Sequence, residues 1–532
     1  MELMKNLVIL LAILLFVSLI LLIVKFLHKV FWMPNHIQNV MRSQGIKGPS
    51  YKFLHGNTKE ILDMRMKPMG RPMDHLSHEI FPRIMPHVHS WVSLYGRNYL
   101  NWYGPQAQLV VTEAELIKEI MNNKDGVYPK IDLEGHAKKL LGDGLSSTKG
   151  DKWTKLRKIA NGVFHGESLK SMIPSMITST ETMLQKWKEH NGQEIEVFEE
   201  FRVLTSEVIY KTAFGSSYLE GKKIFDMLMN KLIKNNDDIE SDKLERGIKD
   251  CIVKIIRKRD QENSMDMGIN DFLGELLEAS RDKDDLKRIT LDDMVDECKT
   301  FYFAGHETTT SLLGWTILLL ATYQEWQEKA RKEVFEFFAK ANPNQDSITR
   351  LKIMNMIVEE SLRLYPPVPA LKRRVKTKVR LGKMTLPPNM ELYISILAVH
   401  HDPRIWGEDV YKFKPDRFEG GKAEATNNTP AAFLPFGFGP RTCVGCAPEV
   451  LGPCAFGLVF DTVLDFPEPL AGRGGETESL RLFTTTIRSV NSMLETEDGS
   501  FKKFCELRMA VVCELSLMIG LLVISSDIDL IG

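Results

Sequence analysis

The most informative stretch of the sequence is Phe436-Gly437-Phe438-Gly439-Pro440-Arg441-Thr442-Cys443-Val444-Gly445. Its three glycines allow the backbone to wrap closely around the Cys443 sulfur, including the positive φ angles that a tight loop can require. The N–H groups of such a loop can temper the charge of a metal-bound thiolate. Phe436 and Gly437 would lie against a flat ligand, and Arg441 would supply a cation for a carboxylate. These features predict that Cys443 is the thiolate ligand of a haem iron.

Two other interpretations of this stretch remain open from the residues alone. The loop could hold an ordinary buried cysteine. Alternatively, Cys443 and Cys446, with Cys454, could form a zinc or redox site. Zinc would need a fourth ligand of suitable spacing, and none is evident nearby in the sequence.

A second stretch, Ala304-Gly305-His306-Glu307-Thr308-Thr309, lies inside a long predicted helix. This helix begins at Thr290, where Asp293 can complete a capping box, and runs to about Tyr323. Glycine costs about 1 kcal/mol against alanine in a helix interior, and Thr308 can bond back to a preceding carbonyl and loosen the turn. The stretch therefore suggests a groove for dioxygen and water, although a packing or capping feature is an alternative.

Two further groups of residues could support a haem. Trp153 and Arg157 lie one turn apart on a predicted helix, so an indole N–H and a guanidinium could both reach propionates. Glu360 and Arg363 share one helix face at i, i+3 spacing, and Arg417 could complete a three-part network. Such a pair alone is usually a weak surface bridge, so its value lies in the combination with the other motifs.

These four elements occur in the order and approximate spacing of the cytochrome P-450 monooxygenases, and the chain resembles this family from its N-terminal helix to about Gly445. Residues 51–57 and 296–301 are similar to the plant clan that contains hormone- and terpenoid-modifying hydroxylases. The resemblance implies a mainly α fold with small β-sheets, preceded by one N-terminal transmembrane helix. It also implies heme b (iron protoporphyrin IX) as the cofactor.

The resemblance further implies a role for each candidate site residue. Cys443 would be the metal ligand on the proximal side. Thr308 and Glu307 would be catalytic, delivering protons to bound oxygen, with Ala304 and Gly305 beside the oxygen site. The propionates would be held by Trp153, Arg157 and Arg441, together with Arg373 or its neighbour Arg374. Glu360, Arg363 and Arg417 would be structural.

The implied reaction is insertion of one oxygen atom from O2 into a C–H bond, with electrons from an NADPH-cytochrome reductase. A small apolar substrate is expected, such as a terpenoid, a hormone-like compound or a fatty acid, because Phe301-Tyr302-Phe303 and the proline-rich segment 366–371 are apolar. Four lysines around Trp153 could form a basic face for the reductase, or simply a solvated helix face: Lys149, Lys152, Lys155 and Lys158.

The bulk composition is that of a globular protein. The chain has 532 residues, of which 43% are hydrophobic and 26% charged, and a formal net charge of -1. No basic excess is available to neutralise phosphates, which argues against nucleic acid as a partner. The seven cysteines lack a framework spacing, which suggests a reducing compartment rather than a disulfide scaffold.

The N-terminus predicts a membrane anchor. Leu7–Val24 is apolar apart from Ser18 and is followed by Lys25 and Lys29, which favours a cytosolic catalytic domain. A cleaved signal peptide is the rival, but it would need a shorter core and a small-residue cleavage site. We therefore expect a single-pass anchor in the endoplasmic reticulum membrane.

The predicted organisation has four parts: a membrane anchor over 1–30, a proline/glycine hinge over 31–49, a haem-thiolate catalytic domain over 50–445 and an atypical C-terminal tail over 446–532. Within it we expect a hairpin of strands 98–103 and 108–112, a helix from about 349 to 365, and a strand over 391–399. At the end of that strand, His400-His401-Asp402 is expected to make local hydrogen bonds.

Two segments depart from the family pattern. The prolines and glycines of 446–453 oppose the helix that follows the thiolate loop in the family, and the polar segment 231–242 is shorter than its counterpart. Both departures resemble altered splice joints or a mispredicted gene model. They raise a second hypothesis, in which the chain is a membrane-anchored P-450-like protein that lacks haem or catalytic activity.

Overall fold

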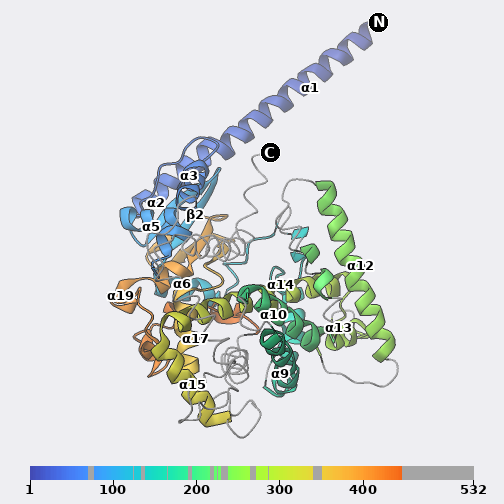
Figure 1. Ribbon diagram of the computed structural model, residues 1–532. Helices are drawn as coiled ribbons and strands as arrows, with labels where there is room; N and C mark the ends of the chain where they lie inside the picture. The colour runs from blue at the N-terminus through green and yellow to red at the C-terminus, as the bar shows by residue number, and fades with distance from the viewer. Residues whose placement is uncertain are drawn as a thin grey trace, which may run out of the picture. The chain divides into compact units, whose positions relative to one another are not determined.

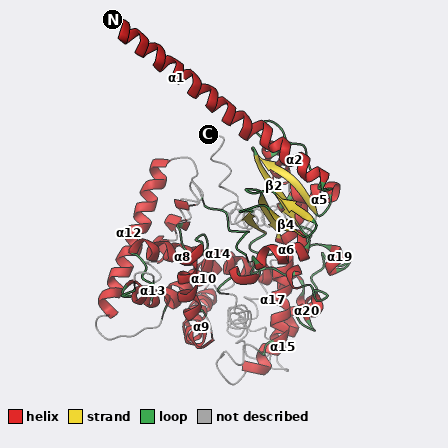
Figure 2. Cartoon of the chain, turned by 180° about the vertical axis from the view of Figure 1, so that it is seen from behind, coloured by secondary structure: helices red, strands yellow, loops and turns green. Residues whose placement is uncertain are grey.

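A computed structural model describes residues 1–69, 77–123, 125–133, 138–139, 141–164, 166–189, 195–215, 221–224, 226–228, 238–263, 271–284, 287–338 and 350–445. The tail after Gly445 and most of the segment 231–242 lie outside these residues. The fold is mainly helical with small sheets, which confirms the predicted class (Figure 2).

The chain forms two compact units, which we describe separately (Figure 1). Unit 1 comprises Met1–Arg71, Glu79–Pro129 and Ala370–Val399, and unit 2 comprises the described residues of Pro72–His78, Lys130–Pro369 and the chain from His400 onward.

The elements of unit 1 are α1 (Glu2–Leu27), the π-helical turn η1 (His28–Trp32), α2 (Met33–Ser43), α3 (Thr58–Met69), α4 (Phe81–Ile84), α5 (Pro86–Tyr95), β1 (Asn98–Tyr103), β2 (Gln106–Val111), α6 (Ala114–Asn122), β3 (Ala370–Arg374), β4 (Val379–Leu381), β5 (Met384–Leu386), β6 (Glu391–Ser395) and α18 (Ile396–His400). Helix α1 contains no buried residue, and together with η1 and α2 it is long and apolar enough to cross a membrane.

Pro34 lies inside this helix and does not end it. Proline lacks an N–H and crowds the carbonyl four residues earlier, which here belongs to Val30. The turn before Pro34 opens into η1, and the Tyr51 hydroxyl donates to the Val30 carbonyl, giving it a partner that proline cannot provide. The chain turns instead at Gly45, whose φ is +83°. Gly48 then packs against β1, where any side chain would overlap the Leu100 carbonyl.

Unit 1 also contains a four-stranded sheet in the order β1-β2-β6-β3 and a two-stranded sheet of β4 and β5. The hairpin of β1 and β2 is confirmed, with Tyr103 opposite Gln106 and Gly104 in the turn at φ +52°. Strand β6 pairs in parallel with β2 and antiparallel with β3. The predicted strand 391–399 is wrong over its last four residues. The Ser395 hydroxyl accepts a hydrogen bond from the Ala398 N–H at 3.3 Å, which starts helix α18.

The elements of unit 2 are α8 (Gly150–Val163), α9 (Gly166–Glu189), α10 (Val197–Phe214), α12 (Asp238–Asn263), α13 (Phe272–Ser280), α14 (Leu291–Thr322), α15 (Gln324–Phe338), α17 (Lys352–Leu364), α19 (Pro403–Trp406), η2 (Pro415–Phe418), α20 (Lys422–Ala425), η3 (Pro430–Ala432) and η4 (Gly439–Arg441). Helix α17 ends just before Pro366, as expected.

Helix α14 is the long central helix of unit 2. Thr290 and Asp293 make both bonds of the predicted capping box at its start. Phe301 and Tyr302 on this helix are buried and pack against rings from neighbouring elements: Phe301 stacks on Phe164 with centroids 5.2 Å apart, and Tyr302 stacks on Phe214 at 4.2 Å. These two side chains therefore contribute to the core, whereas the sequence suggested that they line a substrate pocket.

Candidate functional site

The loop around Cys443 is wrapped as its glycines predict. Gly437 and Gly439 have φ angles of +76° and +73°, which side-chain-bearing residues rarely adopt. The Cys443 N–H donates to the Phe436 carbonyl at 2.9 Å, and the Thr442 N–H donates to the Gly439 carbonyl at 3.0 Å. Cys443 itself is exposed. The loop is thus a closed, hydrogen-bonded turn with an exposed cysteine.

Two guanidinium groups and one indole lie at this loop. Arg441 donates to the Thr148 carbonyl at 2.8 Å, and its guanidinium carbon lies 4.2 Å above the centre of the Trp153 ring. Arg157, one turn after Trp153 on α8, donates to the Thr442 carbonyl at 2.5 Å. The structure therefore brings together the three residues that the sequence assigned to propionates in this part of the chain. Their two positive charges suit the carboxylates of a haem.

The segment before α8 is held against α14 by acidic side chains that the sequence did not single out. The Asp143 N–H donates to Asp296 at 2.9 Å, and the Leu145 N–H donates to the Glu297 carboxylate. Gly144 allows this approach, because a Cβ there would lie 2.9 Å from the Glu297 Oε1. Burial raises the pKa of Glu297 to about 8. These bonds fix the segment before α8 to the central helix. The same segment contains Thr148, whose carbonyl accepts the hydrogen bond from Arg441.

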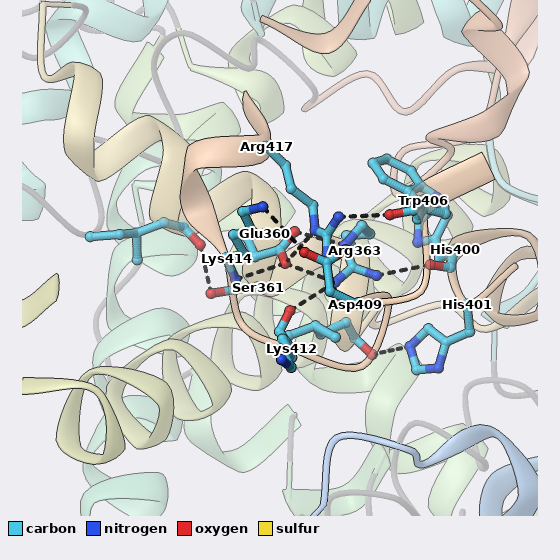
Figure 3. A network of polar contacts seen from close by, with 12 residues as sticks. Glu360, Ser361, Arg363, His400, His401, Trp406, Asp409, Lys412, Lys414 and Arg417 are labelled. Atoms are coloured by element: carbon cyan, nitrogen blue, oxygen red, sulfur yellow. Dashed lines mark hydrogen bonds and ion pairs between the residues drawn. The ribbon is translucent and has the colours of Figure 1, made fainter. Parts of the chain in front are cut away.

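The predicted network of Glu360, Arg363 and Arg417 is confirmed (Figure 3). Arg363 binds both oxygens of Glu360 at 2.7 Å, and neither side chain is exposed. Arg417 donates to Glu360 at 3.3 Å and to the Trp406 carbonyl at 2.7 Å. The Lys414 N–H adds a bond of 3.0 Å to the same carboxylate. Because the buried Glu360–Arg363 pair has further hydrogen-bond partners in Arg417 and Lys414, the network is expected to be rigid.

His400 connects this network to the thiolate loop. Arg363 donates to the His400 carbonyl at 3.0 Å, and the His400 Nε2 accepts from the Leu434 N–H at 2.9 Å. The Leu434 carbonyl in turn accepts from the Gly437 N–H at 3.0 Å. Burial lowers the pKa of His400 to about 3, so its ring is neutral and can accept. The prediction of local hydrogen bonds is therefore wrong for His400, whose partners lie 34 and 37 positions away in the sequence.

The Ala304–Thr309 stretch has one open and one closed side. Ala304 is exposed and Thr308 half-buried, although most of α14 is buried. The Thr308 hydroxyl donates to the Ala304 carbonyl at 2.7 Å, as the sequence suggested. Gly305 has a different reason for its small size, because a Cβ there would lie 2.8 Å from Cδ1 of Ile209 on α10. Its absence of a side chain lets the two helices approach.

His306 and Glu307 occupy the closed side. The His306 Nδ1 lies 3.0 Å from the Glu307 Oε1, and the side chains are 1% and 2% exposed. The His306 Nε2 lies 3.0 Å from the backbone oxygen of Arg202 on α10. The pair is therefore shielded from bulk water and fixed between two helices.

The lysines around Trp153 do not form one uncompensated basic face. Lys149 pairs with Asp132 at 2.6 Å, and Lys152 pairs with Asp143 at 3.1 Å and Asp293 at 2.7 Å. Much of the local positive charge is thus neutralised by acids of the same unit, which favours the interpretation of a solvated helix face.

Arg373 lies in unit 1, on β3, and is 4% exposed. It donates to the Lys372 carbonyl at 2.8 Å, and burial lowers its pKa to about 10. Arg374 instead pairs with Glu391 at 3.0 Å. Of the two neighbours, Arg373 is the one that the described residues leave without a carboxylate. Its assignment to a propionate stays a prediction.

The donor set fits a haem better than a bare metal ion. Among the described residues, no group of three or more His, Cys, Asp or Glu side chains could hold a metal. An exposed thiol in a rigid loop with two adjacent guanidinium groups suits an iron that arrives with its own four nitrogen ligands and two carboxylates. Cys446 and Cys454 of the zinc hypothesis lie outside the described residues.

Comparison with known proteins agrees with this geometry. The family model described as Cytochrome P-450 matches residues 82–447. Cytochrome P-450 CYP749A22 of Panax ginseng is 54% identical over 451 residues, which cover 81% of this chain and 86% of that protein. Cytochrome P-450 734A1 of Arabidopsis thaliana is 40% identical over 458 residues, with the same coverage of 81% and 86%. Secologanin synthase 1 of Catharanthus roseus is 37% identical over 441 residues, covering 77% and 84%.

Proposed function

The chain belongs to the cytochrome P-450 monooxygenase family, with a haem held by a thiolate, and on that premise we propose that it inserts one oxygen atom from O2 into a C–H bond of a small apolar substrate. The observation that carries the proposal is the wrapped Cys443 loop with Arg157, Arg441 and Trp153 beside it. A terpenoid, a hormone-like compound or a fatty acid is the proposed substrate class, and an NADPH-cytochrome reductase the electron donor.

Each of the candidate site residues would have a separate role in this reaction. A haem bound through Cys443 supplies the iron at which O2 is activated. Arg157 and Arg441 would hold its carboxylates, and the Phe436–Cys443 turn would keep the thiolate in place. The Thr308 hydroxyl, half-buried beside the exposed Ala304, would donate a hydrogen bond toward oxygen after releasing its bond to the Ala304 carbonyl. Glu307 supplies the proton that the reduction of O2 consumes.

The spectrum of the reduced, carbon-monoxide-treated full chain tests this proposal. We expect a thiolate-type Soret band that disappears in Cys443→Ala and persists in Cys251→Ala, a half-buried cysteine on α12. Incubation with a panel of terpenoids, hormone-like compounds and fatty acids should then give an oxygenated product that depends on NADPH and the reductase. A well-folded chain without the band contradicts the proposal.

The second candidate is a P-450-like protein without haem or activity. The observation that favours it is that the family match ends at residue 447, whereas the chain continues to residue 532. The same spectrum separates the two functions. A band that appears only when residues 446–532 are replaced by the corresponding segment of the Panax ginseng relative would assign the defect to the tail.

The apolar helix α1 is consistent with a membrane anchor. We propose that it holds the protein in the endoplasmic reticulum membrane as a single-pass anchor, with the catalytic domain in the cytosol. We expect the protein to stay in the membrane during carbonate extraction. We also expect protease added to intact microsomes to digest the catalytic domain completely. Protection of the catalytic domain from the protease would place it on the other side.

A further inference from the structure

We propose that His306 is a positioning residue that keeps Glu307 supplied with a proton. The two side chains form a buried hydrogen-bonded pair beside Thr308. The hydrogen bonding of the pair follows from its geometry, whereas its use in oxygen activation rests on the proposed function.

The first step concerns Nε2 of His306. This atom lies 3.0 Å from the backbone oxygen of Arg202. A carbonyl oxygen has no hydrogen and can only accept, so Nε2 must carry the hydrogen of that bond. Nε2 of His306 is therefore the donor in its bond to the Arg202 carbonyl on α10.

The second step concerns Nδ1, which lies 3.0 Å from the Glu307 Oε1. A hydrogen bond between these atoms needs one proton. It can sit on Nδ1, giving an imidazolium and a carboxylate, or on Oε1, giving a neutral imidazole and a carboxylic acid. Both arrangements have the same number of protons and no net charge.

The third possible state lacks this proton. It would place the lone pair of Nδ1 against a carboxylate oxygen at 3.0 Å, with both side chains at most 2% exposed. A buried charge without a partner is strongly unfavourable. The hydrogen-bonded geometry consequently favours the two arrangements that share a proton over the one that lacks it.

The surroundings hold the pair rigidly. The Thr310 hydroxyl donates to the His306 carbonyl at 3.0 Å and meets the Thr205 hydroxyl of α10 at 2.7 Å. Gly305 keeps α10 and α14 in close contact through Ile209. His306 is therefore fixed by α10 at one nitrogen and offers the other to Glu307.

In the reaction, Glu307 would release one proton from Oε1 toward oxygen through Thr308. A proton from water then replaces it, and no electron moves within the pair. His306 acts through Glu307, by sharing with it the proton that Glu307 gives and regains. It does not itself touch the oxygen.

The direct test is spectroscopic and needs no turnover. In the reduced, carbon-monoxide-bound full chain with labelled histidine, nitrogen NMR reports whether Nδ1 of His306 is protonated, with the signal assigned by its loss in His306→Gln. Infrared difference spectra against Glu307→Gln report a protonated carboxyl. We expect one of the two signals. The absence of both overturns the proposal.

The kinetic test compares two variants that preserve different bonds. In His306→Gln the side-chain amide can still donate to the Arg202 carbonyl, and in His306→Asn the amide can still donate to Glu307. Neither amide can exchange a proton with Oε1. We therefore expect product formed per NADPH to fall about tenfold or more in both, because proton transfer by a positioned group contributes on the order of 10² or more.

The outcomes separate this proposal from the proposed function. If a His306 variant keeps the wild-type carbon-monoxide band, thermal midpoint and amount of product formed per NADPH, the role of His306 is overturned. The proposed monooxygenase function is unaffected by that result. A wild-type chain without the band would refute the function. In that case the same NMR and infrared measurements, made without carbon monoxide, still decide the proton content of the pair.

Discussion

Replacing Arg363 by methionine should remove one of the strongest single contributions to the stability of unit 2. Arg363 makes two bonds of 2.7 Å to Glu360 and bonds of 3.0 and 3.4 Å to the carbonyls of His400 and Lys412. Loss of one partner of a buried ion pair costs about 3–5 kcal/mol, and a buried carbonyl left without its donor adds about 1 kcal/mol. We expect a loss near 5 kcal/mol in the free energy of unfolding.

Urea titration of the full chain in detergent measures this loss, with Arg331→Met as the matched control. Arg331 pairs with Glu328 at 2.6 Å and the same i, i+3 spacing, but the two side chains are 35% and 63% exposed. The control should lose less than about 1 kcal/mol. In the double variant Glu360→Met/Arg363→Met no carboxylate is left uncompensated, so it should be more stable than Arg363→Met alone.

The result that would refute this reasoning is a loss in Arg363→Met no larger than in the control. The carbon-monoxide band supplies a second readout, because Arg363 holds His400 and His400 holds the backbone before Gly437. The band should weaken in Arg363→Met at urea concentrations where the helices remain intact. Loss of band and helix at one common midpoint would contradict that connection.

Three further predictions follow from single contacts. Glu297 has a folded pKa raised to about 8, so its contribution to stability is complete below the unfolded pKa of about 4.3 and is lost as pH rises through 8. Between these values the wild type should lose up to about 1.4 kcal/mol per pH unit relative to Glu297→Gln, and parallel pH profiles of unfolding would contradict this. Gly144→Ala should cost about 1–3 kcal/mol because its Cβ would overlap Thr300 and Glu297. Gly162→Ala, with no atom within 4 Å of the new Cβ, should instead gain up to about 1 kcal/mol; equal thermal midpoints for the two variants would count against the contact. Thr308→Ala should leave the carbon-monoxide band intact but uncouple NADPH use from product formation, and unchanged coupling would remove the role assigned to Thr308.

Local signals in the sequence identified the elements whose ends are set by neighbouring residues. The Thr290 capping box, the Gly104 turn of the hairpin and the Pro366 stop of α17 each act within a few residues. The Glu360 and Arg363 pair was also predictable, because i, i+3 spacing on a helix places both groups on one face.

Contacts between distant segments could not be predicted in the same way. The parallel pairing of β2 with β6 joins residues more than 280 positions apart, as between Gln108 and Glu391. The apolar character of Phe301 is equally compatible with a pocket and with a core, and only its rotation on α14 decides between them. His400 likewise owes its role to Leu434, which the chain brings to it through tertiary structure.

The helix continues from Glu2 to Ser43 through the π-helical turn η1, so the proposed anchor and α2 form one rod. Between Val24, the last residue of the apolar run, and the fully buried Met41, the helix rises about 25 Å at 1.5 Å per residue. The Tyr51 hydroxyl supports the helix at Val30, between these two points. With the anchor in a bilayer, its tilt follows the thickness of the membrane. A thicker or thinner membrane would then rotate the sheet of unit 1 relative to the lipid surface.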